Sequence, residues 1–346
     1  MASNMTEQKS TNRLGLTLES YKGSPSTLCP GCGHDTITRH IIQAFYEYGV
    51  EPHRVAKMSG IGCSSKTPAY FLSRSCGFNS VHGRMPSVAT GAKVANRSLL
   101  VHGVSGDGDT AAIGLGQFCH LIRRNVPMIY LIENNGVYGL TKGQFSATSD
   151  PGSKQKKGAV NPFDTIDCAA IAIQLGCSFV ARSFSGDAKQ MVPLLKAAIA
   201  HRGTALLDVI SPCVTFNNHE GSTKSYAYVQ KTDTPLHALD FVPFYEETHV
   251  DYAEGTVKDL ALPDGSHLVL KKLGKEYDPA DRITAIKTLE EGRAKGQLIT
   301  GLLYLNSKKK DFIEIEELVD TPLCELGEKD LKPSSETLKK ILERYA

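Results

Sequence analysis

The sequence predicts an α/β fold, with a mostly parallel β-sheet, helices on both of its faces, and a C-terminal extension. Strand-like and helix-like segments alternate along most of the chain before residue 213. The strand-like segments are continuously apolar rather than alternating, as in sheets that are buried on both faces. Glycine-rich or acidic turns follow several of them, at the edge where such sheets bind ligands.

The first expected helix covers residues 34–49, where Ile37, Ile41 and Phe45 follow helical spacing and Gly49 provides a C-terminal stop. The next elements are a strand and glycine-rich turn within 53–63, a helix over 87–97, a strand over 98–109, a helix over 111–125 and a strand over 126–135. A solvated loop at 149–163 precedes a helix over 164–176, a strand over 178–184, a helix over 187–203 and a strand over 204–213.

The chain divides into three expected regions: a flexible N-terminal arm at 1–20, a core domain at 21–235 and an extension at 236–346. Within the extension, residues 278–296 and 334–345 are typical of amphipathic helices. Between them, residues 307–318 form a charged segment with a strand-like centre. We expect the extension to pack on the core or on a partner.

The composition is that of an ordinary globular protein, with 41% hydrophobic and 22% charged residues. A formal net charge of +2 gives no case for binding nucleic acid or an anionic membrane. The polar start of the chain lacks the apolar segment of a signal peptide, and no apolar run approaches the length of a membrane span. We therefore expect a soluble, cytoplasmic protein.

The sharpest local signal is "GDGD" at 106–109, followed by "NN" at 134–135. Asp107 and Asn135 each follow an expected strand, so their side-chain oxygens can meet at the carboxyl edge of one sheet. With a nearby backbone carbonyl they would supply three oxygen ligands to Mg²⁺, which commonly bridges to phosphate. Read separately, each residue would be an ordinary turn residue. Their spacing matches the thiamine-diphosphate motif.

Two of the nine cysteines, Cys29 and Cys32, form a Cys-x-x-Cys pair in "LCPGCGHD". A reducing cytoplasm disfavours a disulfide, which leaves metal binding or redox chemistry. From spacing alone, zinc is the favoured occupant. Cys119, Cys168 and Cys177 lie in apolar contexts and are expected to be small core residues.

Six segments in one order resemble the β subunit of a 2-oxoacid:ferredoxin oxidoreductase over roughly residues 20–235. They are "CPGCGH" (29–34), "GIGCSSK" (60–66), "HGRMPSVATGAKVAN" (82–96), "GDGDTAAIGLGQFCHLIRRN" (106–125), "NNGVYGLTKGQFSAT" (134–148) and "SPCVTFNNHEGSTKSY" (211–226). The resemblance implies a thiamine-diphosphate-binding fold, with the cofactor's pyrimidine half-site on an α subunit in an assembly expected to be α2β2. It also implies coenzyme A as co-substrate and an external ferredoxin as electron acceptor.

The resemblance further implies which residues hold the cofactors. Asp107, Asn135 and the carbonyl of Val137 would bind Mg²⁺. Four cysteines would hold one [4Fe–4S] cluster, namely Cys29, Cys32, Cys63 and Cys213. The residues expected to contact the cofactors are Ile61, Gly62, Cys63, Ser64, His82, Gly106, Asp107, Gly108, Asp109, Asn135, Gly139 and Leu140.

Lys66 and Lys142 match family positions that face the active site, and Arg84 is a further candidate for holding a substrate carboxylate. The "TFNNHEGSTKSY" segment and the chain beyond the core are more similar to 2-oxoglutarate-type than to pyruvate-type β subunits. The pyruvate type is the first alternative. A non-redox thiamine-dependent decarboxylase or synthase would not need the four cysteines together, and a zinc-stabilised scaffold would need neither Asp107 nor Asn135.

Overall fold

A computed structural model describes residues 10–154, 158–217, 222–235, 257–261, 267–271 and 277–345. Its centre is an eight-stranded sheet of order β2-β1-β3-β4-β8-β7-β12-β9. The strands are β1 (Val55–Ser59), β2 (Cys76–Asn79), β3 (Leu100–Gly106), β4 (Met128–Asn134), β7 (Phe179–Phe184), β8 (Thr204–Ile210), β9 (Asp233–Pro235) and β12 (Leu298–Leu305). All neighbouring pairs are parallel except β12 with β7, which confirms the expected mostly parallel sheet.

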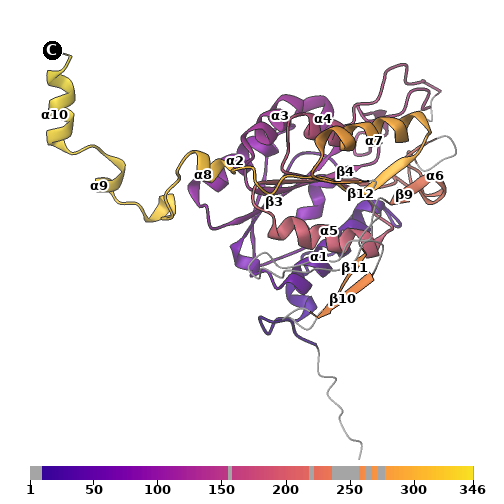
Figure 1. Cartoon of the computed structure of the whole chain (residues 1–346), viewed down its shortest axis with the longest axis horizontal. Helices are drawn as coiled ribbons and strands as arrows, with labels where there is room; N and C mark the ends of the chain where they lie inside the picture. Colours follow the sequence, from indigo (N-terminus) through magenta and orange to yellow (C-terminus); the bar gives the residue numbers. More distant parts are fainter. Residues whose placement is uncertain are drawn as a thin grey trace, which may run out of the picture.

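Helices cover both faces of the sheet, which is seen edge-on in Figure 1. One face carries α1 (Gly33–Tyr48) and α5 (Ala188–Ala200). The other carries α2 (Met85–Ala95), α3 (Leu115–Arg124), α4 (Cys168–Gln174) and α7 (Arg282–Ala294). Every residue of β4, β7 and β8 is buried between these layers, which explains their continuous apolar runs. No helix in the described part of the chain could cross a bilayer.

Shorter elements complete the chain. The single turns are η1 (Leu18–Tyr21), η2 (Pro52–Arg54), η3 (Ser64–Ala69), the π-helical η4 (Gly108–Ile113) and η5 (Leu323–Glu325). Two hairpins pair β5 (Val137–Tyr138) with β6 (Gln144–Phe145) and β10 (Val257–Ala261) with β11 (His267–Lys271). The remaining helices are α6 (Tyr226–Thr232), α8 (Phe312–Ile315), α9 (Glu328–Leu331) and α10 (Ser335–Glu343).

The C-terminal region contributes to the sheet itself. β12 lies after residue 235 and pairs with both β7 and β9. The central sheet therefore extends beyond residue 235, the expected boundary between core domain and extension. The strand-like centre expected within 307–318 is wrong, because Asp311 and Glu314 form a capping box that starts α8. Farther along, α10 projects from the body, with its apolar residues Leu338 and Ile341 exposed (Figure 1).

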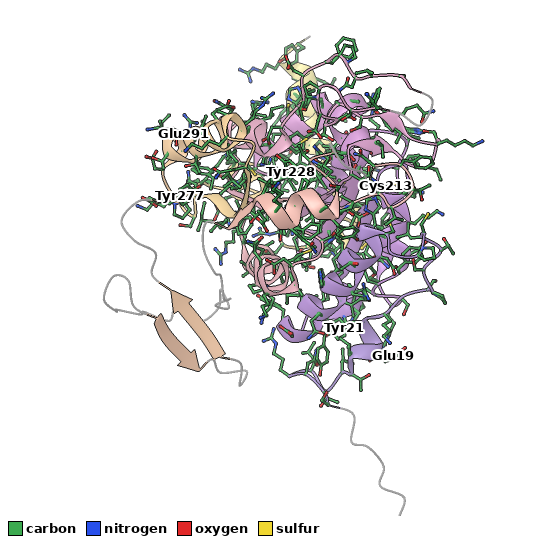
Figure 2. The ribbon with its side chains drawn as sticks, turned by 90° about the vertical axis from the view of Figure 1, so that its right-hand side faces the viewer. Glu19, Tyr21, Cys213, Tyr228, Tyr277 and Glu291 are labelled. Carbon is green, nitrogen blue, oxygen red and sulfur yellow. The ribbon has the colours of Figure 1, made fainter. Side chains whose placement is uncertain are left out.

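Residues 10–20, the second half of the expected flexible arm, make defined contacts with the core. The Asn12 amide donates hydrogen bonds to the Tyr21 hydroxyl (2.8 Å) and to the Tyr46 carbonyl (2.9 Å). Tyr21 is fully buried and donates to the Val50 carbonyl at 2.8 Å; Figure 2 shows it on the body of the molecule. These contacts fasten residues 10–20 to α1. Residues 1–9 lie outside the described part of the chain.

His102 of β3 is a fully buried histidine whose two ring nitrogens have no hydrogen-bond partner. Its ring lies between those of Phe45 and Phe71, with each centroid 5.4 Å away. Burial, and secondarily the nearby Lys57 ammonium, lowers the pKa of His102 to about 3. The folded chain therefore keeps this side chain neutral through the mildly acidic range, whereas the unfolded chain protonates it below about pH 6.5.

We predict that His102→Leu makes stability less sensitive to acid. A lowered folded-state pKa stabilises the fold above the unfolded-state pKa, and this contribution is lost as the pH falls. Between pH 7 and pH 5 the wild type should lose about 2 kcal/mol more unfolding free energy than the variant. Urea unfolding at both pH values measures the difference, with the exposed His53→Leu as control. Equal losses in wild type and His102→Leu would contradict the prediction.

Candidate functional site

A pocket of about 520 Å³, partly open to solvent, lies at the carboxyl ends of β1, β3 and β4. The strand order reverses between β1 and β3, and such switch points are where open α/β sheets bind ligands. All twelve residues expected to contact the cofactors line this pocket, together with Val137. The structure therefore brings five sequence-distant motifs to one cavity.

Asp107 and Asn135 lie side by side in the pocket, as expected from their places after β3 and β4. The Asn135 backbone N–H donates to Asp107 Oδ1 at 3.2 Å. The Asn135 amide oxygen accepts from the Val137 N–H at 3.1 Å, which folds the chain after β4 into a tight turn. Asp107 is only 1% exposed, and burial raises the pKa of its carboxyl group. Among the described residues, no cation forms an ion pair with it.

The rest of the "GDGD" turn lines the pocket and also has a structural role. Asp109 accepts hydrogen bonds from the Gly83 N–H (2.8 Å) and from Ser105 Oγ (2.9 Å), which ties the loop that carries His82 to the end of β3. Position 108 must be glycine, because an added Cβ would lie 2.4 Å from the Tyr138 ring. The helix expected from residue 111 instead begins as the π-helical η4, a conformation often found at functional sites.

Two pocket residues, Glu133 and His34, were not identified from the sequence. Both are buried, and Thr67 Oγ1 hydrogen-bonds the Glu133 carboxyl group at 2.9 Å. His34 Nδ1 lies 2.5 Å from Ser211 Oγ and 3.6 Å from Glu133 Oε2. Burial raises the pKa of Glu133 well above its usual value and lowers that of His34 to about 4, so the fold favours both neutral forms. The sequence did offer one signal for Glu133, because it is an acidic residue inside the apolar strand 126–135.

The four cysteines expected to bind a cluster lie in segments close to this pocket, and Cys63 is part of its lining. Cys29 and Cys32 share a turn in which the Cys32 N–H donates to the Cys29 carbonyl at 3.0 Å. A Cβ on Gly139 would lie 3.4 Å from Cys63 Sγ and 3.9 Å from Cys213 Sγ, so both thiols face that glycine.

Two of the four thiols, those of Cys32 and Cys63, have pKa values that are raised. Burial raises the pKa of Cys32 to about 12, and Glu133 and then Cys213 add to the rise. Burial likewise raises the pKa of Cys63, with contributions from Cys213 and Cys29. Within the described ranges, no three His, Cys, Asp or Glu side chains form a group that could hold a metal ion. Of the expected core cysteines, Cys168 and Cys177 are buried and Cys119 is half-buried.

The three basic candidates do not line the pocket. Lys66 lies in η3, two residues after the pocket residue Ser64, and its ammonium lies 3.5 Å from Thr27 Oγ1. Lys142 is exposed, next to the pocket residue Thr141, and has a φ of 81°. Arg84 is exposed at the N-cap of α2.

This fold and pocket are those of a thiamine-diphosphate enzyme. In agreement, residues 60–209 match the family "Thiamine pyrophosphate enzyme, C-terminal TPP binding domain". The chain is 42% identical over 289 residues to the "2-oxoacid:ferredoxin oxidoreductase 2, subunit beta" of Aeropyrum pernix, which covers 83% of this chain and 82% of the relative. The chain therefore belongs to the β subunits of the 2-oxoacid:ferredoxin oxidoreductases.

Two further relatives carry 2-oxoglutarate in their names. The "2-oxoglutarate oxidoreductase subunit KorB" of Mycobacterium tuberculosis is 39% identical over 191 residues, or 55% of this chain and 51% of the relative. The structure of 2-oxoglutarate:ferredoxin oxidoreductase from Magnetococcus marinus, with 2-oxoglutarate, coenzyme A and succinyl-CoA bound, has 29% sequence identity and a TM-score of 0.72. The match covers 96% of each chain.

Proposed function

We propose that the chain, together with an α subunit, converts 2-oxoglutarate and coenzyme A to succinyl-CoA and CO₂, with electrons leaving through a [4Fe–4S] cluster to ferredoxin. The same reaction can run in reverse as CO₂ fixation. The observation that carries the proposal is the single pocket in which the expected magnesium and thiamine residues meet, with Cys63 in its lining and Cys213 near the same pocket residue, Gly139.

The pocket fits thiamine diphosphate and Mg²⁺ chemically. Asp107 is a buried carboxylate without an ion-pair partner among the described residues, and a hard divalent cation would compensate its charge. Asp107, the Asn135 amide oxygen and the Val137 carbonyl would hold the metal, and Gly108, Asp109, Gly139 and Leu140 would lie along the diphosphate. When bound, the cofactor supplies an electron sink for decarboxylation.

The cysteines fit a polynuclear cluster better than a single zinc ion. A zinc site needs ligands grouped within about 2.3 Å of one metal, and the described residues contain no such group of three. Cys213 nevertheless lies near enough to raise the pKa of Cys32, and Cys213 and Cys29 lie near enough to raise the pKa of Cys63. A cube of four irons takes one outer thiolate per iron, and when bound it supplies a one-electron carrier.

The proposed site is incomplete within this chain, and its rim is apolar. Leu140 lines the pocket and is 55% exposed, and Val81, next to His82, is 70% exposed. Ile113 at the end of η4 and Phe78 of β2 are exposed as well. Exposed apolar residues around a half-formed pocket favour a protein partner. We assign this surface to the α subunit, which would bring the pyrimidine half-site.

The choice of 2-oxoglutarate rests on the relatives named for it, among them the solved structure that spans nearly the whole chain. This substrate has a second carboxylate that needs a cation. We assign that role to Lys66 and Lys142, because each lies within two residues of a pocket residue, and Arg84 is a further candidate.

The test is to purify the chain anaerobically with its α subunit and to follow CoA-dependent viologen reduction. We expect turnover with 2-oxoglutarate, a much lower rate with pyruvate, and about four iron and four sulfide per chain. Turnover with pyruvate alone would refute the substrate assignment. Zinc in place of iron would refute the redox function, and full activity without a partner would refute the split site.

A further inference from the structure

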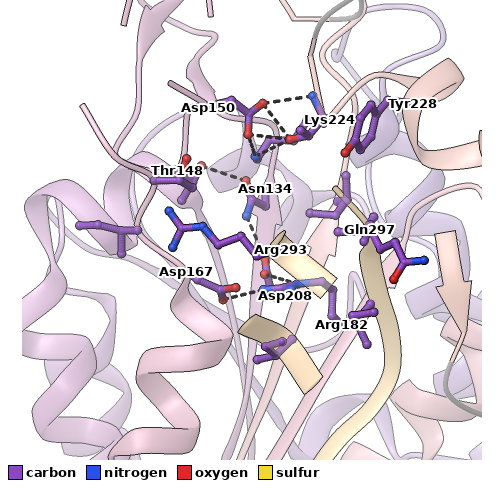
Figure 3. A pocket seen from close by; sticks show the side chains of 17 residues that line it. Asn134, Thr148, Asp150, Asp167, Arg182, Asp208, Lys224, Tyr228, Arg293 and Gln297 are labelled. Atoms are coloured by element: carbon purple, nitrogen blue, oxygen red, sulfur yellow. Dashed lines mark hydrogen bonds and ion pairs between the residues drawn. The ribbon is translucent and has the colours of Figure 1, made fainter. Parts of the chain in front are cut away.

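A continuous series of buried polar side chains runs from Asp107 away from the cofactor pocket, across the ends of the central strands. Figure 3 shows its far part, from Thr148 through Asn134 and Asp208 to Arg182. We propose that Thr148 is a positioning residue that orients the Asp107 carboxylate for metal binding. This inference rests on the proposed function, because it concerns the residue assigned to Mg²⁺.

Thr148 lies at the partition between two cavities. Asp107 lines the cofactor pocket, whereas Thr148 and Asn134 line a second cavity of about 780 Å³ on the other side. Thr148 is 1% exposed, and its Oγ1 lies 2.7 Å from Asp107 Oδ2 and 3.0 Å from Asn134 Oδ1. Ser146 Oγ also donates to Asp107 Oδ2. With the Asn135 N–H on Oδ1, three donors fix the plane of the carboxylate.

The hydroxyl of Thr148 has one hydrogen and three neighbouring acceptors, Asp107 Oδ2, Asn134 Oδ1 and, at 3.0 Å, Ser146 Oγ. Hydrogen bonds to an ionised carboxylate are shorter and stronger than those to a neutral amide. The shortest distance is the one to Asp107, so the hydrogen belongs there when Asp107 is ionised. Thr148 and Ser146 therefore both hold Asp107 Oδ2, which fixes the orientation of the carboxylate.

Asn134 is itself held from the far side. Its amide NH₂ donates to Asp208 Oδ1 at 3.0 Å, so its oxygen must face Thr148. Asp208 is fixed by Arg182 Nε at 3.0 Å, and Arg182 Nη2 donates to Asp167 Oδ1 at 2.6 Å. Asp167 caps the N-terminus of α4 through the Ala170 N–H. Asn134 is thus fixed through β8, β7 and α4 with its oxygen toward Thr148, as a competing acceptor for that hydroxyl.

Partners that orient a ligating carboxylate typically change metal affinity by about 10–100-fold. Because Ser146 remains, we expect Thr148→Val to weaken binding by about 10-fold and Ser146→Ala/Thr148→Val by about 100-fold. Thr148→Ser keeps the hydroxyl and should retain affinity close to that of the wild type. If Thr148 had only a structural role, Thr148→Ser and Thr148→Val would not differ in metal affinity while both kept the fold intact.

The experiment uses the complex with its α subunit and titrates Mn²⁺ in the presence of thiamine diphosphate, with free Mn²⁺ followed by electron paramagnetic resonance. The matched control is Thr300→Val, which removes another buried threonine hydroxyl that donates to a carboxylate, Asp233 at 2.6 Å. Equal affinity of wild type and Thr148→Val, with thermal midpoints within a few degrees, would overturn the inference.

The outcomes separate the inference from the proposed function. If the wild-type complex does not bind Mn²⁺ with thiamine diphosphate, the proposed function fails. If the wild type binds and Thr148→Val, Thr148→Ser and Thr300→Val all weaken binding equally, the effect is general destabilisation and the positioning role fails. Only loss in Thr148→Val with retention in both Thr148→Ser and Thr300→Val supports it.

Discussion

Asp107→Asn should weaken divalent-metal binding in the presence of thiamine diphosphate by at least about 100-fold, because it removes the negative charge of a direct ligand and does not merely alter an outer partner. Asparagine keeps the shape of the side chain but not its negative charge. Catalytic turnover of the complex should fall in parallel. Calorimetric titration of the complex with Mg²⁺ and the viologen assay measure the two effects.

The same variant should be at least as stable as the wild type in the absence of metal. Burial raises the pKa of Asp107, so keeping that carboxylate ionised at neutral pH lowers the stability of the folded chain. Asp233→Asn is the matched control, because burial also raises the pKa of Asp233 and a threonine hydroxyl also donates to it. A strongly destabilised Asp107→Asn, or one with unchanged metal affinity, would contradict the assignment of Asp107.

Cys32→Ala should abolish electron transfer to viologen while thiamine diphosphate still binds. The Cys32 thiol is buried beside the pocket but is not among the residues that line it, so its loss removes one cluster ligand and leaves the metal and diphosphate contacts intact. Iron and sulfide analysis, with electron paramagnetic resonance after dithionite reduction, should show the cluster lost or degraded.

Cys177→Ala is the matched control for this experiment. Burial raises the pKa of Cys177 to about 12, as it does for Cys32, but the Cys177 thiol donates to the carbonyls of Phe179 and Thr204 and not toward the pocket. This variant should keep its iron, with at most some loss of stability. A full complement of iron in Cys32→Ala, or equal loss of iron in both variants, would contradict the cluster assignment.

Much of the candidate site could be predicted because its residues sit in short motifs at strand ends. Once strands 98–109 and 126–135 are assigned, a parallel sheet brings Asp107 and Asn135 together. Glu133 and His34 could not be found this way, because their contact joins residues about 100 positions apart and depends on how α1 packs beneath the sheet. Thr148 was overlooked for the same reason.

The fold was predictable where local patterns and tertiary structure agree. The apolar strands and amphipathic helices of the core lie close to their expected ranges. The sequence did not predict the placement of segments that a single long-range contact holds. β12 joins the sheet through its pairing with β7, and hydrogen bonds of Asn12 and Tyr21 hold residues 10–20. Neither contact leaves a periodic pattern in the sequence.

The position of β8 in the sheet has a consequence for biogenesis. β8 lies between β4 and β7, and the loop that follows it carries Cys213, whereas Cys29 and Cys32 enter the chain more than 180 residues earlier. During synthesis the nascent chain can present three of the four thiols long before the fourth exists. A cluster held by all four cysteines, as we propose, would be completed only after β8 has reached its place, so we expect iron delivery to follow folding of the sheet.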